Sequence, residues 1–271
     1  MDRKTKLFVA IPSVGSIVDS QVYALREIEN RYKDWIEFVY PKQLVQRIFH
    51  DSARNGLVEE FLESECDIMW FLDSDVAPPK HILDLITIHS DKWQAAGAPY
   101  PIFVHLPGSV DSNPKIAFTA YKNSNETKTG MALAAIPDSG IDIVDGLATG
   151  CLFIKREVFS KLEKPYFEFK YNKETRVIEE GEDLGFCLKL QKLGIKFFTD
   201  YSMVCKHKKT VCLLELNNYA IEYANAKIGA YDSFVREQVQ KLAGVVESQK
   251  AKILELEKRL DTRSKLILPG A

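Results

Sequence analysis

Short apolar runs alternate with longer stretches of helical spacing between about residue 7 and residue 201. Three runs are typical of buried strands, at residues 7–11, 35–40 and 67–72. Each is followed by a stretch in which apolar residues lie one helical turn apart, at residues 22–29, 53–62 and 81–88. Strands that alternate with helices imply parallel crossovers and a sheet covered by helices on both faces. The pattern therefore predicts an α/β fold.

The middle of the chain, residues 95–144, breaks this alternation. It contains several glycines and the prolines Pro99, Pro101, Pro107, Pro114 and Pro137. Two short apolar segments, 115–121 and 131–136, are bounded by turn residues and predict strands. We expect an irregular, partly antiparallel insert that forms one wall of a pocket.

The last part of the chain repeats apolar residues at alternating intervals of three and four between about 235 and 260. One seam position holds Val239, Val246, Ile253 and Leu260, and the other holds Val235, Leu242, Gln249 and Leu256. This pattern predicts a coiled coil that favours a parallel pair; the alternative is a long amphipathic helix packed on its own domain. We expect a globular domain at 1–212 and a helical extension at 213–271 that makes the protein a homo-oligomer.

Composition limits the class of protein. The 271 residues are 46% hydrophobic and 27% charged, and 36 Lys and Arg against 38 Asp and Glu give a formal net charge of -2. A protein that coats nucleic acid or an anionic membrane usually carries a basic surface. The charge balance argues against both of these classes, although it leaves room for a local basic groove.

The cysteines and the N-terminal region bear on location. The five Cys residues form no C-x-x-C pair, which favours buried thiols in a reducing compartment. The apolar run at 7–11 is too short for a signal-peptide core, and far shorter than the ~20 residues of a membrane-spanning helix. We expect a cytoplasmic protein without a membrane span, located in a host cytoplasm if a phage encodes it.

Two aspartates, in Asp73-Ser74-Asp75, follow directly on the apolar run that ends at Leu72. Open α/β sheets bind ligands at the carboxyl ends of their strands, and two carboxylates one residue apart can share a hard divalent cation. Such a cation can hold the phosphates of a bound nucleotide and neutralise their charge. The plainer interpretation is a solvated turn, since Asp is common in turns.

Two further acids, Glu182 and Asp183, open the helix predicted after Gly181. Carboxylates at a helix start can cap the helix and favour its positive end. A carboxylate at the mouth of a pocket can also act as a general base that takes a proton from an attacking hydroxyl group. From the sequence, both interpretations carry equal weight.

His207 stands among Lys206, Lys208 and Lys209, after a strand predicted around residues 195–198. A histidine among three lysines is an unusual core residue, because Lys is almost never fully buried. His207 is therefore either part of a solvated basic loop or a metal ligand with the lysines near phosphate oxygens.

In this order the motifs resemble those of the GT-A-fold nucleotide-sugar glycosyltransferases, closest to the family 2-like, short soluble type of bacteria and large phages. The resemblance covers about residues 6–208. It rests on Val9-Ala10-Ile11-Pro12, Ala53-Arg54-Asn55, the D-x-D motif Asp73-Ser74-Asp75, the stretch 145–159, Gly181-Glu182-Asp183 and His207. It implies a Rossmann-like mixed sheet with helices on both faces, a nucleotide-sugar donor, and Mn²⁺ or Mg²⁺ as the metal.

The resemblance also implies roles for single residues. The nucleotide and its sugar would be bound by Pro12, Ser13, Val14, Arg54, Asp73, Ser74 and Gly150. The metal would be held on the diphosphate by Asp75 and His207, with Asp73 beside them. Glu182 would bind the acceptor or the sugar, and Asp183 would be the base of an inverting displacement.

Two departures from the family pattern bear on the activity. The family usually ends its second strand with an acid that reads the base, whereas this strand ends in Tyr40-Pro41-Lys42-Gln43. The donor base is therefore open, although a UDP-sugar is expected. The Gln-x-x-Arg-Trp signature of processive polysaccharide synthases is absent, which favours transfer of a single sugar. The acceptor can be a glycan, a protein, a small molecule or a modified DNA base.

Two alternatives use the same residues. A metal-dependent nucleotidyltransferase or phosphohydrolase would need the same carboxylates and histidine. A non-catalytic sugar-binding scaffold, assembled through the coiled coil, would keep the fold but have an inactive site. Because the sequence lacks both G-x-x-x-x-G-K-[ST] and G-x-G-x-x-G, it offers no support for an ATP-type or NAD-type phosphate loop.

Overall fold

The computed structural model describes residues 3–12, 17–42, 49–104, 115–127, 130–134 and 140–209, together with residue 250. The chain divides into two compact units, residues 1–210 and 211–271. Ser13, Val14 and, apart from Lys250, the coiled coil predicted over 235–260 lie outside the described residues. The boundary at 212 and the homo-oligomer stay predictions.

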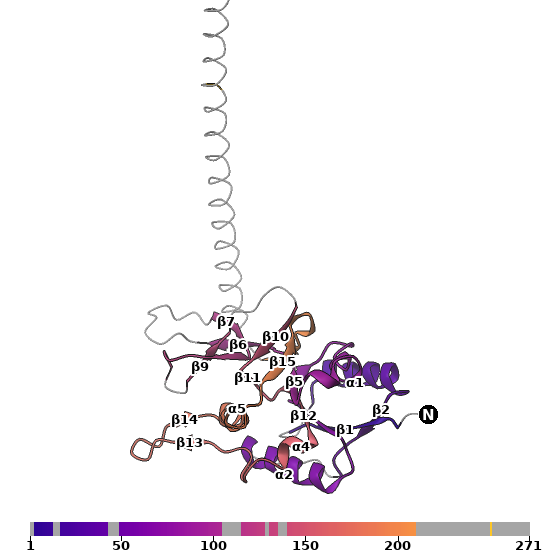
Figure 1. The fold of residues 1–271 in the computed structure, drawn as a ribbon, viewed down its shortest axis with the longest axis horizontal. Helices are drawn as coiled ribbons and strands as arrows, with labels where there is room; N and C mark the ends of the chain where they lie inside the picture. Colours follow the sequence, from indigo (N-terminus) through magenta and orange to yellow (C-terminus); the bar gives the residue numbers. More distant parts are fainter. Residues whose placement is uncertain are drawn as a thin grey trace, which may run out of the picture. The chain divides into compact units, whose positions relative to one another are not determined.

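A seven-stranded mixed sheet forms the centre of the first unit. Its strands are β1 (Thr5–Ala10), β2 (Ile36–Val39), β3 (Ile68–Leu72), β5 (Ala95–Gly97), β10 (Ile141–Val144), β12 (Cys151–Lys155) and β15 (Phe197–Asp200). They lie in the order β10-β15-β5-β12-β3-β1-β2 (Figure 1). β1 is parallel to β2 and β3, whereas β12 is antiparallel to both β3 and β5. The predicted α/β class with a mixed sheet is confirmed.

Five α-helices and two short 3-10 helices lie among the described residues. They are α1 (Asp19–Tyr32), α2 (His50–Glu63), α3 (Asp84–Thr87), α4 (Arg156–Phe159) and α5 (Glu182–Lys192), with 3-10 turns at Ser90–Lys92 and Tyr201–Met203. The helix predicted over 81–88 is correct only at α3. The residues before α3 form i→i+3 hydrogen bonds instead, from Ile82 N–H to Pro79 O and from Asp84 N–H to His81 O (both 3.0 Å), which is 3-10 geometry.

The two faces of the sheet are covered by different helices. Leu25 of α1 shares one hydrophobic cluster with Val9 of β1. Leu57 of α2 and Phe186 of α5 share a second cluster with Phe8. Because neighbouring residues of a strand point to opposite faces, α1 covers one face, and α2 and α5 cover the other (Figure 1).

Small antiparallel sheets complete the unit. Their strands are β4 (Val76–Ala77), β6 (Pro101–Val104), β7 (Lys115–Phe118), β8 (Ala120–Asn123), β9 (Met131–Leu133), β11 (Gly146–Leu147), β13 (Lys170–Tyr171), β14 (Ile178–Glu180) and β16 (Lys206–His207). The pairs are β6-β7, β8-β9, β8-β11, β13-β14 and β4-β16. The partly antiparallel insert is confirmed, and the single strand predicted over 115–121 divides at Thr119 into β7 and β8.

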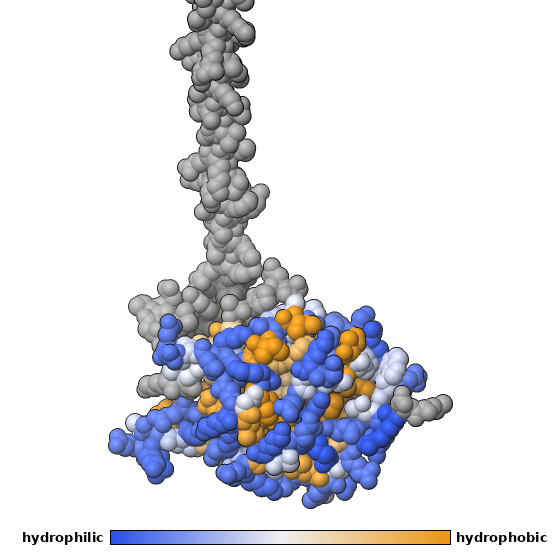
Figure 2. Space-filling view, viewed as in Figure 1, coloured by the Kyte–Doolittle hydropathy of each residue, from blue (hydrophilic) through white to orange (hydrophobic). Residues whose placement is uncertain are grey.

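The surface mixes polar and apolar side chains, as the face drawn in Figure 2 shows. Single exposed apolar residues such as Tyr23, Trp35 and Ile88 are ordinary for a folded domain. Among the residues that the structure describes, no helix is long and apolar enough to cross a membrane.

Candidate active site

The loop Asp73-Ser74-Asp75 leaves the sheet at the carboxyl end of β3, whose five residues are all buried. β12 runs antiparallel to β3 with Cys151 opposite Leu72, so the chain before β12 arrives at the same edge. The N–H of Asp73 donates a hydrogen bond to the carbonyl oxygen of Gly150 (3.0 Å). The predicted positions 73–75 and 150 therefore meet at one edge of the sheet.

The start of α1 fixes this loop through a residue that the sequence interpretation missed. Nε2 of Gln21 donates hydrogen bonds to the carbonyl oxygens of Asp73 (2.6 Å) and Val76 (2.9 Å). Gln21 is completely buried. It lies four residues before Leu25, on the apolar side of the helix. A buried polar side chain needs hydrogen-bond partners. A glutamine at an apolar position of the predicted helix is therefore the feature of the sequence that could have pointed to Gln21.

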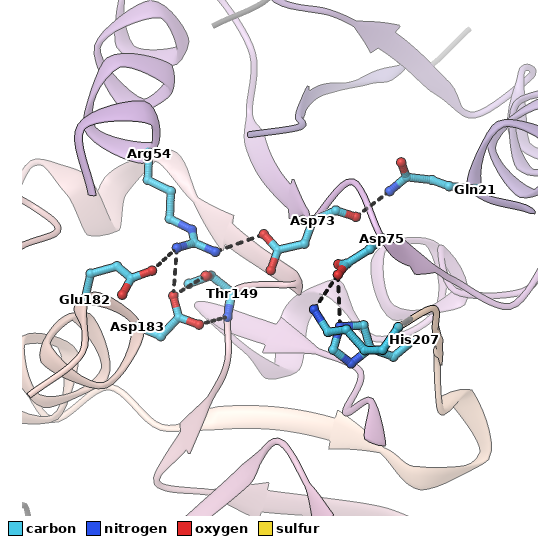
Figure 3. A network of polar contacts seen from close by, with 9 residues as sticks. Gln21, Arg54, Asp73, Asp75, Thr149, Glu182, Asp183 and His207 are labelled. Atoms are coloured by element: carbon cyan, nitrogen blue, oxygen red, sulfur yellow. Dashed lines mark hydrogen bonds and ion pairs between the residues drawn. The ribbon is translucent and has the colours of Figure 1, made fainter. Parts of the chain in front are cut away.

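Arg54 of α2 lies between the acids of the β3 loop and those of α5 (Figure 3). Nη2 of Arg54 lies 2.9 Å from Asp73 Oδ1, and Nη1 lies 3.1 Å from Asp183 Oδ1. Nη1 also forms an ion pair with Glu182 Oε1. The Arg54 side chain is only 2% exposed, so one buried cation holds three carboxylates. A contact between Arg54 and the nucleotide stays a prediction.

Burial is the leading electrostatic influence on this cluster. It raises the pKa of Asp73, which Arg54 lowers and Asp183 raises again. Burial and the charge of Asp183 likewise raise the pKa of Glu182. Burial works against the charge of Arg54, but the three carboxylates together raise its pKa. When all three acids are ionised, the cluster carries an excess of negative charge.

Asp183 has a second anchor in Thr149. Oγ1 of Thr149 donates a hydrogen bond of 2.5 Å to Asp183 Oδ1, and the Thr149 N–H lies 3.4 Å from Oδ2. The Asp183 side chain is 27% exposed, whereas that of Glu182 is 12% exposed. Of the two acids that open α5, Asp183 is therefore the more accessible, and its orientation is fixed from two sides.

Asp75 belongs to a second group, with His207 and Lys209. β4 follows Asp75 directly and pairs with β16, which puts His207 opposite Val76. His207 Nε2 lies 3.3 Å from Asp75 Oδ2 (Figure 3), and Lys209 Nζ lies 2.5 Å from the same oxygen. Burial opposes the charge of Asp75, but hydrogen bonds from His207 and Lys209 lower its pKa.

The hydrogen bonds of His207 test whether this group fits a metal ion. Nδ1 lies 2.7 Å from the carbonyl oxygen of Pro101. Because a carbonyl oxygen only accepts, Nδ1 carries the proton. A neutral ring leaves Nε2 as an acceptor that faces the carboxylate of Asp75, and a cation can then lie between the two; a protonated ring instead donates from Nε2 to Asp75. Metal-binding histidines commonly donate their other N–H in this way, so the residues present fit a divalent cation.

The two ligands Asp75 and His207 do not complete a coordination shell. Within the described ranges no group of three or more His, Cys, Asp or Glu side chains is placed to hold a metal ion. Mg²⁺ in phosphate-handling sites commonly takes one or two carboxylates and completes its shell with substrate phosphates and waters. The carboxylate of Asp73 is directed to Arg54, so its predicted place beside the metal stays a prediction.

Gly150 packs against an aromatic ring that the sequence interpretation also missed. A Cβ on Gly150 would lie 2.5 Å from Cε1 and 2.6 Å from the hydroxyl oxygen of Tyr100, so the close approach of this ring requires glycine here. The ring also meets His207 edge-on, with 4.8 Å between the ring centroids. Burial, followed by the charges of Asp73 and Asp183, raises the pKa of Tyr100. The predicted contact of Gly150 with the sugar stays a prediction.

The other predicted residues follow strands that end at this edge. Pro12 comes after β1, which is parallel to β3 with Ala10 opposite Phe71, and it is buried. Ser74 is half-buried, and its carbonyl oxygen accepts a hydrogen bond from the N–H of Val18 (3.0 Å). Their contacts with a nucleotide stay predictions.

Comparison with known proteins leaves the family open. No protein-family model and no curated protein matches the chain. The crystal structure of A197 from STIV is similar, with a TM-score of 0.49 and 21% identity over 76% of this chain and 86% of that chain. The crystal structure of GalNAc-T7 with UDP, GalNAc and Mn²⁺ has a TM-score of 0.43 and 11% identity over 77% of this chain and 44% of that chain. Similarities this remote identify neither a family nor an activity. The function has to be inferred from the geometry of the site.

Proposed function

We propose that the protein is a metal-dependent glycosyltransferase that moves a single sugar from a nucleoside diphosphate sugar, with a UDP-sugar as the expected donor, to an acceptor hydroxyl. One observation carries the proposal: two different groups meet at the carboxyl edge of the sheet. Asp75 with His207 suits a cation bound to phosphate. Asp183, held by Arg54 and Thr149, suits a proton acceptor.

Asp75 and His207 are the residues that would hold Mn²⁺ or Mg²⁺. When bound, the ion supplies positive charge to the diphosphate leaving group. Arg54 contacts one carboxylate oxygen each of Asp73 and Glu182. The second oxygen of each acid is the proposed acceptor for hydroxyl groups of the sugar or the acceptor.

Asp183 is the proposed base because it is the more accessible acid of α5 and is held in one orientation. In an inverting displacement the acceptor oxygen attacks the anomeric carbon as the bond to the diphosphate breaks. Asp183 takes the proton of the acceptor hydroxyl, and the diphosphate leaves with the electron pair of the broken bond.

A thermal-shift panel of nucleotide sugars, with and without Mn²⁺, tests the proposal. A ligand that binds only the folded state raises Tm as its concentration exceeds Kd. Stabilisation by one donor that depends on Mn²⁺ would support the proposal and would identify base and sugar together.

Product analysis separates the alternatives. Release of a nucleoside diphosphate indicates glycosyl transfer, whereas a nucleoside monophosphate or pyrophosphate indicates a phosphohydrolase or a nucleotidyltransferase. If no donor is hydrolysed and no nucleotide binds with Mn²⁺, a non-catalytic scaffold becomes the better interpretation.

A further inference from the structure

The backbone of Tyr100 is held firmly beside the site. Its N–H donates a hydrogen bond to Thr119 Oγ1 (3.1 Å), and its carbonyl oxygen accepts one from the Thr119 N–H (3.2 Å). The carbonyl oxygen of the next residue, Pro101, lies 2.7 Å from His207 Nδ1. The backbone next to Tyr100 therefore contacts His207, the proposed metal ligand, directly.

The ring of Tyr100 is constrained as well. It packs on the backbone of Gly150, where even one added carbon atom would come within 2.5 Å of it. Its edge contact with His207 has 4.8 Å between ring centroids. Tyr100 is 5% exposed, and a ring packed this closely keeps its orientation. The position of its hydroxyl group is therefore fixed.

The hydroxyl group of Tyr100 lies against Gly150, where an added Cβ would come within 2.6 Å of its oxygen. Burial, followed by the charges of Asp73 and Asp183, raises the pKa of this hydroxyl group. In the described part of the chain no group forms a hydrogen bond with this hydroxyl group, and its oxygen is not completely buried. A phenol with an ordinary pKa of about 10 keeps its proton at neutral pH. Tyr100 thus offers a hydrogen-bond donor to whatever binds between the two groups.

We propose that the Tyr100 hydroxyl donates a hydrogen bond to the β-phosphate of the nucleoside diphosphate, the group that leaves when the sugar is transferred. This inference rests on the proposed function. The Tyr100 ring contacts His207, which suits the diphosphate. It also packs on Gly150, whose neighbour Thr149 anchors the proposed base Asp183, so Tyr100 adjoins residues of both groups of the proposed site.

Tyr100 keeps its proton throughout the reaction. The acceptor proton goes to Asp183, the new bond forms between the acceptor oxygen and the anomeric carbon, and the electron pair of the broken bond passes to the phosphate oxygen. A preorganised donor stabilises charge that develops at that oxygen. The hydrogen bond therefore becomes stronger as the diphosphate leaves, and it persists in the product complex.

The variant Tyr100→Phe removes the hydroxyl group and keeps the ring on Gly150 and His207. Calorimetry would measure the affinities of wild type and variant for UDP and UMP in the presence of Mn²⁺, with GDP and GMP as the second pair of probes. Loss of one hydrogen bond to a charged group lowers affinity about 10- to 100-fold. Since only the diphosphate carries a β-phosphate, we expect weaker UDP binding and unchanged UMP binding.

Tyr166→Phe is the matched control. Tyr166 is also buried and packs edge-on against Phe159, and it lines a pocket with Thr5 and Lys155 at the opposite edge of the sheet. Its substitution should change neither affinity. A purely structural role of Tyr100 would change both affinities or neither, so an unchanged ratio of UDP to UMP affinity in Tyr100→Phe overturns the inference.

Failure of the proposed function gives a different result: the wild type itself then binds neither UDP nor GDP with Mn²⁺. If Tyr100→Phe does not fold, 3-fluorotyrosine at position 100 replaces it, because it retains the ring and makes the hydroxyl a stronger donor. It should raise the preference for UDP over UMP, and an unchanged preference overturns the inference.

Discussion

Replacing Arg54 with methionine perturbs the charge arrangement of the site directly. The substitution removes the cation that Asp73, Glu182 and Asp183 share and leaves an apolar side chain in its place. Because the Arg54 side chain is only 2% exposed, water does not take over its role. Removing one partner of a buried ion pair costs about 3–5 kcal/mol of stability. At roughly 2–4 °C per kcal/mol for a domain of this size, Tm should fall by about 6–20 °C.

The fall in Tm should depend on pH. The folded-state pKa values of Asp73 and Glu182 are raised, mainly by burial, above the ordinary values of 3.8 and 4.5. An acid with a raised folded-state pKa contributes its full stability below the unfolded pKa and loses it as pH rises through the folded pKa. Without Arg54 both pKa values rise further, so Arg54→Met should lose more stability at pH 7 than at pH 5.

Thermal unfolding followed by circular dichroism at both pH values measures these effects. Arg3→Met is the matched control, because Arg3 pairs with Asp67 at 3.0 Å on the surface and its side chain is 66% exposed. Exposed pairs of this kind contribute about 0–1 kcal/mol. The reasoning would be refuted if Arg54→Met melted like Arg3→Met, or if it lost equal stability at pH 5 and pH 7.

Three further substitutions probe single contacts. Thr149→Val removes the 2.5 Å hydrogen bond to Asp183 and should lower kcat about 10-fold or more with donor affinity retained; steady-state kinetics with an unchanged kcat would contradict this. Gly150→Ala brings a Cβ within 2.5 Å of the Tyr100 ring and should cost about 1–3 kcal/mol in denaturant unfolding, whereas wild-type stability would show that the ring can move. Asp183→Asn should keep donor binding in calorimetry and lose transfer; unchanged transfer would place the base elsewhere or indicate a retaining mechanism.

The elements with the strongest hydrophobic patterns are the ones that the sequence predicts well. β3 is an unbroken run of five buried residues, and the charged loop at 73–75 marks its end. The strand predicted over 115–121 is less accurate because both β7 and β8 are apolar enough to continue through Thr119. Their different partners divide them, since β7 pairs with β6 and β8 pairs with β9 and β11. Pairing of this kind depends on distant residues and leaves no local pattern.

The site itself is predicted in its acids and less well in what holds them. Arg54 is expected at the nucleotide, yet its partners Asp73 and Glu182 lie 19 and 128 residues away in the chain. The two hydrogen bonds of Gln21 span 52 and 55 residues. A single sequence does not reveal which distant groups a buried polar side chain will meet. Tyr100 is missed for the same reason, because its significance lies in its packing on Gly150 and His207.

Metal-dependent sugar transfer at Asp75 and His207 is tested most directly by nucleoside diphosphate release from a panel of nucleotide sugars. The wild type, Asp75→Ala and His207→Ala would each be assayed with Mn²⁺ and with EDTA, after circular dichroism has shown that all three are folded. We predict release by the wild type with Mn²⁺ only, and none by either variant. Release that persists in EDTA, or full activity in either variant, would contradict the proposed metal site.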